Sequence, residues 1–275
     1  SLHDALPISQ AEYFSTSLAP HAPYTVNEAH LALLAQTAQQ TGQRVQIHLQ
    51  ETHEEVSNSL REYGCRPLQR LQRHDLVNQQ FTAIHAVALS AEDIALLAQQ
   101  AASIVHCPVS NLKLGCGIAP IAACLAAGIP VALGTDGCAS NNRLDLWQEM
   151  RLAALLAKGS SRDAKVLNAW QALWMATQGG ARALGLEQHI GSLQVGKAAD
   201  IIAVSLEDWR HLPRYDLASH LVYVLGREQV AASWVNGRCV ARAGECNAYS
   251  SAALTQLARH WQTVITDLSL PPLQE

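Results

Sequence analysis

The chain has 275 residues, 49% of them hydrophobic and 15% charged, which suits a large folded domain with a smaller module and argues against disorder. A net charge of −4 gives no general attraction to nucleic acid or to an anionic membrane, so we expect neither as a partner. Seven cysteines without a CxxC pair, and the lack of a signal-peptide pattern or of an apolar run of about 18 residues, favour reduced thiols in a cytoplasmic protein.

Residues 16–158 repeat one pattern, in which a short apolar run ends in a polar residue and is followed by an amphipathic helical stretch. The polar residues at the ends of these runs are His21, His48, His85, His106 and Asp136, at separations of 27, 37, 21 and 30 residues. Strands that alternate with helices indicate a parallel sheet. The separations favour an α/β fold of the TIM type, a (β/α)8 barrel, because each unit of that barrel takes about 31 residues.

Local signals predict where the helices begin and end. Thr25 with Glu28, and Thr52 with Glu55, have the spacing of capping boxes and predict two helix starts. Gly42 is expected to end the first of these helices, because glycine is favoured just after a helix C-terminus. Later helices are expected over residues 90–102, 118–127 and 144–158.

The character of the sequence changes after residue 188. Short apolar runs separated by glycine, with a hairpin signal at Asn236–Gly237, predict part of a small β-sandwich module over residues 189–246. Residues 1–188 are then expected to form a portion of the barrel, and residues 247–275 a C-terminal helix and tail.

The residues at the strand ends indicate metal chemistry. The carboxyl ends of barrel strands meet at one mouth, so four histidines and an aspartate would converge there. Neutral imidazole and carboxylate are ligands that suit Zn²⁺ or Fe²⁺. Any one of these histidines alone is more often structural, but their recurrence in five consecutive units favours a metal site.

Glu51 follows His48 by three residues, at the point where the chain leaves a strand and a helix cap begins. Two interpretations stay open for this carboxylate. It takes a proton from a metal-bound water, or it only favours the positive N-terminus of the next helix.

The other histidines have simpler interpretations when they are taken one at a time. His21 lies between two prolines, and its spacing alone favours a turn histidine bonded to the backbone. His106 is expected to be a satisfied core residue, and His53 and His74 are expected to be solvated.

Together these segments resemble the amidohydrolase superfamily in its aminohydrolase branch, and most of all the 5-methylthioadenosine/S-adenosylhomocysteine deaminases. The resemblance runs in family order from about Ala19 to Gly244. The motifs that carry it are "APHAPYTV", "IHLQET", "AIHAV", "VHCPVSNLKLGCGIAP", "GIPVALGTDGCASNN" and "GSLQVGKAADIIAV".

The resemblance implies a role for each matched residue. His48 and Asp136 would bind one divalent metal, most simply Zn²⁺ with Fe²⁺ as the alternative, and Asp136 would also orient the hydrolytic water and contact substrate. Glu51 would be the proton shuttle and a substrate contact, and His85 would polarise the attacking water. His21 would contact the substrate near its ribose.

The reaction that the resemblance implies is hydrolytic deamination of a small nucleoside. The adenine ring of 5-methylthioadenosine or S-adenosylhomocysteine would become the inosine analogue, with loss of ammonia. The sequence leaves the oligomeric state open, with a homo-oligomer as one expectation.

The sequence departs from the family in two respects. The family has an HxH metal pair on its first barrel strand, and the 275 residues contain no HxH. We therefore expect the chain to enter the barrel near strand four and to hold strands four to eight, so that by itself it binds metal weakly and turns over little substrate. Val109 stands where these deaminases often carry a carboxylate or another residue, which leaves the exact substrate open, and residues 1–9, "SLHDALPIS", are expected to match nothing in the family.

Two alternatives remain open. A guanine-type deaminase, another aminohydrolase or a triazine hydrolase would share His48, Glu51, His85 and Asp136, so only substrate contacts separate these activities. A metal-free, catalytically inactive binding protein is the alternative from a different class.

Overall fold

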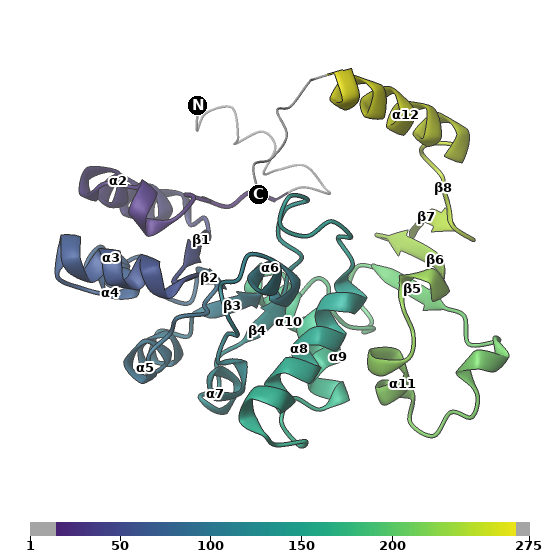
Figure 1. Ribbon diagram of the computed structural model, residues 1–275, viewed down its shortest axis with the longest axis horizontal. Coiled ribbons are helices and arrows are strands. Elements are labelled where there is room, and N and C mark those ends of the chain that lie inside the picture. Colours follow the sequence, from purple (N-terminus) through teal and green to yellow (C-terminus); the bar gives the residue numbers. More distant parts are fainter. Residues whose placement is uncertain (1–14, 268–275) are drawn as a thin grey trace. The chain divides into compact units, whose positions relative to one another are not determined.

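The computed structural model describes residues 15–267, so the N-terminal "SLHDALPIS" and the end of the predicted C-terminal helix and tail lie outside the described residues. The described residues form two compact units (Figure 1). Unit one comprises residues 15–192 and 213–227, and unit two comprises residues 193–212 and 228–267. None of the described helices is long and apolar enough to cross a membrane. All seven cysteines are free thiols.

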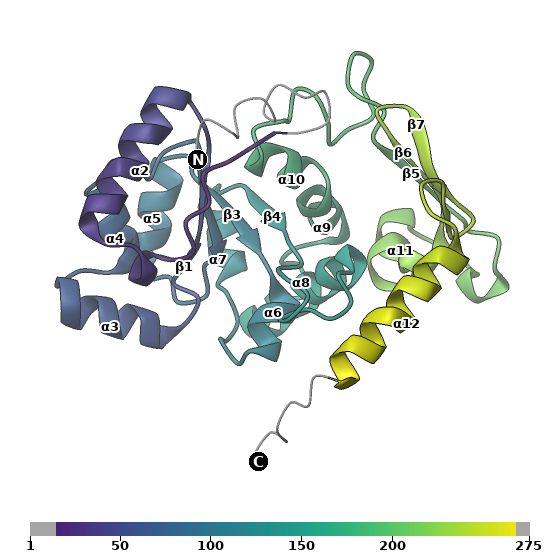
Figure 2. The ribbon, with the colours of Figure 1, turned by 90° about the horizontal axis from the view of Figure 1, so that it is seen from above.

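Unit one is built on a parallel sheet with the strand order β1-β2-β3-β4. Its strands are β1 (Val45–Leu49), β2 (Phe81–His85), β3 (Ser103–His106) and β4 (Val131–Leu133). Figure 2 shows β3 and β4 side by side. The first expected strand, which ends at His21, is instead reduced to one parallel bridge between Leu18 and Val45. Pro20 gives a reason, because it falls within the expected strand and proline has no N–H to donate to a ladder.

Helices follow each strand of unit one, as the alternating pattern predicts, and Figure 1 shows α2, α5, α7 and α8 in succession around the outer side of the sheet. The helical elements of this unit are η1 (Pro23–Thr25), α2 (Glu28–Thr41), α3 (His53–Tyr63), α4 (Pro67–Gln72), α5 (Ala91–Gln99), α6 (Pro108–Lys113), α7 (Ile121–Ala126), α8 (Leu146–Ser161), α9 (Ala169–Ala176), α10 (Gln178–Ala183) and α11 (Leu217–Tyr223). These elements confirm an α/β fold with a parallel sheet.

The first capping prediction was wrong by two residues. Asn27, not Thr25, caps α2, since the Asn27 side chain accepts the His30 N–H. Thr25 belongs to the short turn η1, and its hydroxyl donates to the Ala22 carbonyl. A threonine already engaged in a turn cannot also cap the next helix.

The second capping prediction holds in one half only. Thr52 caps α3 by accepting the Glu55 N–H, at 3.1 Å. The Glu55 carboxylate does not return to Thr52, and instead accepts the backbone N–H groups of Gln50 and Glu51. Gly42 ends α2 in the left-handed region with a φ of +67°, as predicted.

The core of unit one lies between the sheet and its helices. Ile47, Phe81, Ile104 and Val131 come from the four neighbouring strands and are all buried. Each large side chain of this kind contributes about 1.5–3 kcal/mol when it leaves water. On β1 the buried residues alternate with half-buried ones, so His48 lies on the face opposite the core.

Unit two is an antiparallel sheet of four strands in the order β5-β6-β7-β8. Its elements are β5 (Ile201–Val204), η2 (Trp209–His211), η3 (Arg227–Gln229), which starts on the last residue of unit one, β6 (Val230–Val235), β7 (Arg238–Arg242), β8 (Glu245–Cys246) and α12 (Ser251–Asp267). The predicted hairpin joins β6 to β7. Asn236 and Gly237 have φ values of +49° and +75°, as a two-residue hairpin turn of this type requires.

Candidate metal and catalytic site

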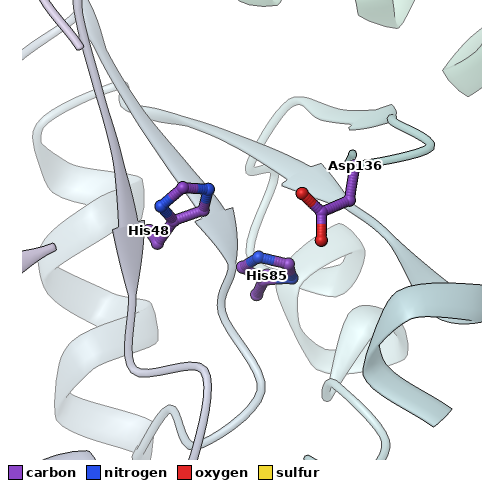
Figure 3. Close-up of side chains that lie close together, drawn as sticks. All are labelled: His48, His85 and Asp136. Atoms are coloured by element: carbon purple, nitrogen blue, oxygen red, sulfur yellow. The ribbon is translucent and has the colours of Figure 1, made fainter. Parts of the chain in front are cut away.

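Three predicted site residues converge at the carboxyl ends of the parallel strands. His48 comes from β1, His85 ends β2, and Asp136 lies in the loop after β4. One ligand atom from each lies within 4.8 Å of the others. Figure 3 shows the two imidazole rings and the carboxylate gathered around one space. Three such ligand atoms at this spacing can hold one divalent cation.

Backbone geometry at the strand ends helps this convergence. Strict alternation would put His85 on the face of its register partner Leu49, which belongs to the core. His85 instead has a φ of +70°, and Asp136 has a φ of +59°. Left-handed backbone is uncommon for residues other than glycine and often occurs at functional sites.

Each histidine is oriented by a hydrogen bond from its Nδ1 atom. His48 Nδ1 lies 2.6 Å from the backbone carbonyl of His21, and a carbonyl can only accept, so this nitrogen carries the proton. His85 Nδ1 lies 2.8 Å from Oδ1 of the buried Asn111 and donates in the same way. These bonds engage Nδ1 in both rings and direct Nε2 to a metal, which is the usual arrangement around metal-binding histidines.

Asp136 is held by two hydroxyl groups. Ser110 and Ser140 both donate to its Oδ2 atom, at 2.7 and 2.6 Å, so Oδ1 is the oxygen that we expect to face a metal. Burial raises the pKa of Asp136, but the hydrogen bonds from Ser110, Ser140 and the Gly137 backbone, together with the charge of His85, outweigh burial and the pKa lies below its ordinary value. A carboxylate that stays ionised is ready to bind a cation.

Glu51 lies beside this cluster, where the strand gives way to the next helix. Its Oε1 atom is 3.8 Å from His85 Nε2 and accepts the Cys116 thiol at 3.4 Å. Gln50 has a φ of +49° and turns the chain there, and Glu55 accepts the backbone N–H of Glu51. The carboxylate is about a quarter exposed, so it can reach both water and a bound molecule.

His21 lies next to the cluster in a cavity of about 310 Å³. Its ring centroid is 5.3 Å from that of His48, at an interplanar angle of 64°. Ile84, Val105 and Asp136 also line this cavity. The cavity therefore brings apolar surface and the candidate metal ligands together.

Two expectations about the remaining histidines were wrong. His106 is buried, but its Nδ1 has no hydrogen-bond partner, so it is not a satisfied core residue. Burial, and secondarily the charge of His85, lowers the pKa of His106 to about 3. His74 is not simply solvated, because its Nε2 lies 2.6 Å from Glu28. His53 is exposed, as expected.

Sequence reasoning missed the residues that hold the cluster in place. Ser110, Asn111 and Cys116 contact Asp136, His85 and Glu51 respectively. Only their position in the sequence could have indicated these residues, because they follow a predicted strand end within "VHCPVSNLKLGCG". Polar residues just after a parallel strand lie at the mouth of the sheet.

Comparison with known proteins gives the family. The family model for the amidohydrolase family matches residues 4–240, which is most of the chain, so the expectation that residues 1–9 match nothing in the family was wrong from residue 4 onward. A 5-methylthioadenosine/S-adenosylhomocysteine deaminase from Teredinibacter turnerae is 44% identical over 243 residues, which cover 88% of this chain and 55% of that protein. The chain spans about half the length of the curated relatives it matches.

Solved structures agree with this assignment. A crystal structure of an adenosine deaminase from Xanthomonas campestris with bound zinc superposes with a TM-score of 0.93 at 43% identity, covering 97% of this chain and 60% of that one. An atrazine chlorohydrolase from Arthrobacter aurescens, complexed with zinc and atraton, gives a TM-score of 0.86 at 27% identity, covering 96% and 59%. The chain belongs to the amidohydrolase family.

Proposed function

We propose that this chain carries the metal-binding and proton-transfer residues of a hydrolytic deaminase that acts on adenosine analogues. Its substrates would be 5-methylthioadenosine and S-adenosylhomocysteine, and its products the inosine analogue and ammonia. The observation that carries the proposal is the convergence of His48, His85 and Asp136 within 4.8 Å, with the Glu51 carboxylate 3.8 Å from His85.

The donor set fits one divalent metal, and we propose zinc. His48 and Asp136 would be ligands, through Nε2 and a carboxylate oxygen, because hydrogen bonds already fix their other polar atoms. The zinc bound in the similar adenosine deaminase supports this choice. A divalent cation held there would lower the pKa of a water molecule and make it a nucleophile at neutral pH. His85 lies close enough either to polarise that water or to act as a third ligand.

Glu51 would move both protons of the reaction. Water adds its oxygen to C6 of the adenine ring, and Glu51 transfers one proton of that water to the adjacent ring nitrogen. The second proton goes to the departing amine, so that the C6–N bond breaks and ammonia leaves. One carboxylate can serve as base and then as acid because it stays within reach of both atoms.

Sequence identity favours a nucleoside substrate over a triazine. Eight curated deaminase relatives are 38–45% identical to this chain and the zinc-bound adenosine deaminase is 43% identical, whereas the chlorohydrolase is 27% identical. We place the ribose side of the substrate at His21, which lines the cavity beside the cluster.

The finer architecture is part of the same proposal. We propose that β1 to β4 and the preceding Leu18 segment are strands four to eight of a (β/α)8 barrel, and that the unit-two sheet is part of a β-sandwich. The domain boundaries at residues 188 and 246, a homo-oligomeric state and a cytoplasmic location also stay predictions.

The test is ammonia release by protein expressed from the complete reading frame that encodes the chain. We expect release from the two adenosine analogues, loss of activity with a chelator, and recovery with Zn²⁺. Glu51→Gln should lower turnover by about 10²–10⁴-fold, since it removes the proton carrier but keeps the side-chain size. Glu54→Gln, an exposed change on the same segment, is the matched control. Near-normal turnover by Glu51→Gln would refute the proton-transfer role, and release from guanine alone would refute the substrate.

A further inference from the structure

Helix α6 is a short element that supports two cluster residues at once. Ser110 and Asn111 are successive residues of this helix, and they contact Asp136 and His85. The residue at its N-cap position, Cys107, provides no side-chain cap. A helix of six residues is marginal by itself, so its position must be fixed from outside.

Glu149, a residue of α8, holds α6 in position. Its Oε2 atom accepts the backbone N–H of Val109, in the first turn of α6, at 3.0 Å. Its other oxygen, Oε1, accepts the side-chain amide of Asn141 at 2.5 Å. Glu149 is 0% exposed and Asn141 is also buried, so water cannot replace either bond.

The two oxygens of Glu149 therefore bind two segments, α6 and the loop after β4, and both segments also contact Asp136. Val109 immediately precedes Ser110, and Asn141 immediately follows Ser140. The hydroxyls of these two serines are the groups that donate to Asp136 Oδ2. Each of the two serines that donate to Asp136 therefore lies next to a residue that is hydrogen-bonded to a different oxygen of the buried Glu149 carboxylate.

We propose that Glu149 is a positioning residue that fixes the Asp136 carboxylate for metal binding by holding α6 and the loop after β4 together. This inference rests on the proposed function, because it assumes that Asp136 is a metal ligand. Glu149 does not line the cavity beside the cluster, and its hydrogen bonds go to the two serine-bearing segments rather than to Asp136.

The chemistry of the site requires a carboxylate. Both partners of Glu149 are N–H donors, so each of its two oxygens must accept. Burial raises the pKa of this carboxyl to about 7, although both hydrogen bonds lower it. An amide at this position would direct its own N–H₂ group at one of the two donors, and one of the two bonds would be lost.

The experiment measures binding of the metal alone. Apoprotein from the complete reading frame is titrated with Zn²⁺ against a chromophoric chelator, and the absorption spectrum of bound Co²⁺ is recorded at saturation. Glu149→Gln should weaken binding by about 10–100-fold, the usual cost of losing a group that orients a metal ligand, and should change the Co²⁺ spectrum.

Asn168→Ala is the matched control for general destabilisation. Asn168 is the exposed N-cap residue of α9, and its loss destabilises the fold without touching the cluster. We expect this variant to keep the metal affinity and the Co²⁺ spectrum of the unaltered protein. An equal loss of affinity in both variants would overturn the inference.

Ser110→Ala tests the route of the effect. If Glu149 acts through the serines, the double variant Glu149→Gln/Ser110→Ala should lose less metal affinity than the product of the fold-losses of the two single variants. Asn141→Ala removes only the hydrogen bond between Glu149 and the loop after β4, so it should weaken metal binding less than Glu149→Gln does. This variant serves as the test if Glu149→Gln does not fold. Unchanged affinity in Glu149→Gln, or fully multiplicative losses, would refute the positioning role. If the unaltered protein binds no Zn²⁺, the proposed function itself fails.

Discussion

His106 gives a quantitative prediction about acid stability. Its imidazole is 2% exposed, its Nδ1 has no hydrogen-bond partner, and its pKa is lowered to about 3 from an ordinary value of 6.5. In the unfolded chain the ring takes up a proton near pH 6.5, whereas in the folded protein it stays neutral until about pH 3. Acid should therefore favour the unfolded state through this residue.

The size of the effect follows from linkage. A depressed folded pKa means that the contribution to stability is complete above pH 6.5 and is lost as the pH falls toward 3. Each pH unit below 6.5 costs about 1.4 kcal/mol. Between pH 7 and pH 5, His106 alone should lower the free energy of unfolding by about 2 kcal/mol.

Urea unfolding of the apoprotein at pH 7 and pH 5 measures this effect. His106→Leu removes the titration and leaves an apolar side chain, so its free energy of unfolding should fall by about 2 kcal/mol less than that of the unaltered protein over this range. His53→Leu, at an exposed site on α3, is the control for loss of an imidazole. An equal fall in the unaltered protein and in His106→Leu would refute this account of the buried ring.

Two further changes test the packing that supports the site. Arg70 is 2% exposed, pairs with the exposed Glu28 and donates to the backbone carbonyls of Pro23 and Val26 at the two ends of η1, so Arg70→Leu leaves these carbonyls without their donor and should lower the free energy of unfolding by about 1–3 kcal/mol. Arg61→Leu on the exposed side of α3 should change it by less than about 0.5 kcal/mol, and comparable losses in the two variants would contradict the buried anchor. Gly134 lies after β4, where an added Cβ would approach the Val105 side chain to 2.6 Å. Gly134→Ala should therefore cost about 1–3 kcal/mol in thermal unfolding, and an unaltered melting temperature would show that the neighbour moves away freely.

The sequence predicts the order of the elements well because hydrophobic periodicity is local. The parallel sheet, the glycine end of α2 and the β6–β7 hairpin all follow from short patterns. The errors lie where two local options compete. Thr25 and Asn27 are both good caps, and only the turn at η1 decides between them.

The candidate site could be predicted in part. Strand-end positions alone indicated that His21, His48, His85, His106 and Asp136 would meet, and three of them, His48, His85 and Asp136, form the cluster. The backbone of His85 could not be predicted, because a left-handed φ at a histidine has no signature in a single sequence. The hydrogen bonds of Glu149 could not be predicted either. Its partners Val109 and Asn141 are 40 and 8 residues away in sequence, and they meet Glu149 only in the folded chain.

The metal centre itself can be tested most directly by anomalous scattering. Crystals of protein from the complete reading frame, grown with Zn²⁺, should give a strong anomalous peak at the zinc edge. We predict this peak about 2.0–2.1 Å from His48 Nε2 and about 2.0–2.2 Å from an Asp136 oxygen, and its distance from His85 Nε2 would separate a ligand from a water-polarising group. A crystal with no peak between His48 and Asp136, or with zinc bound elsewhere, would contradict the proposed centre.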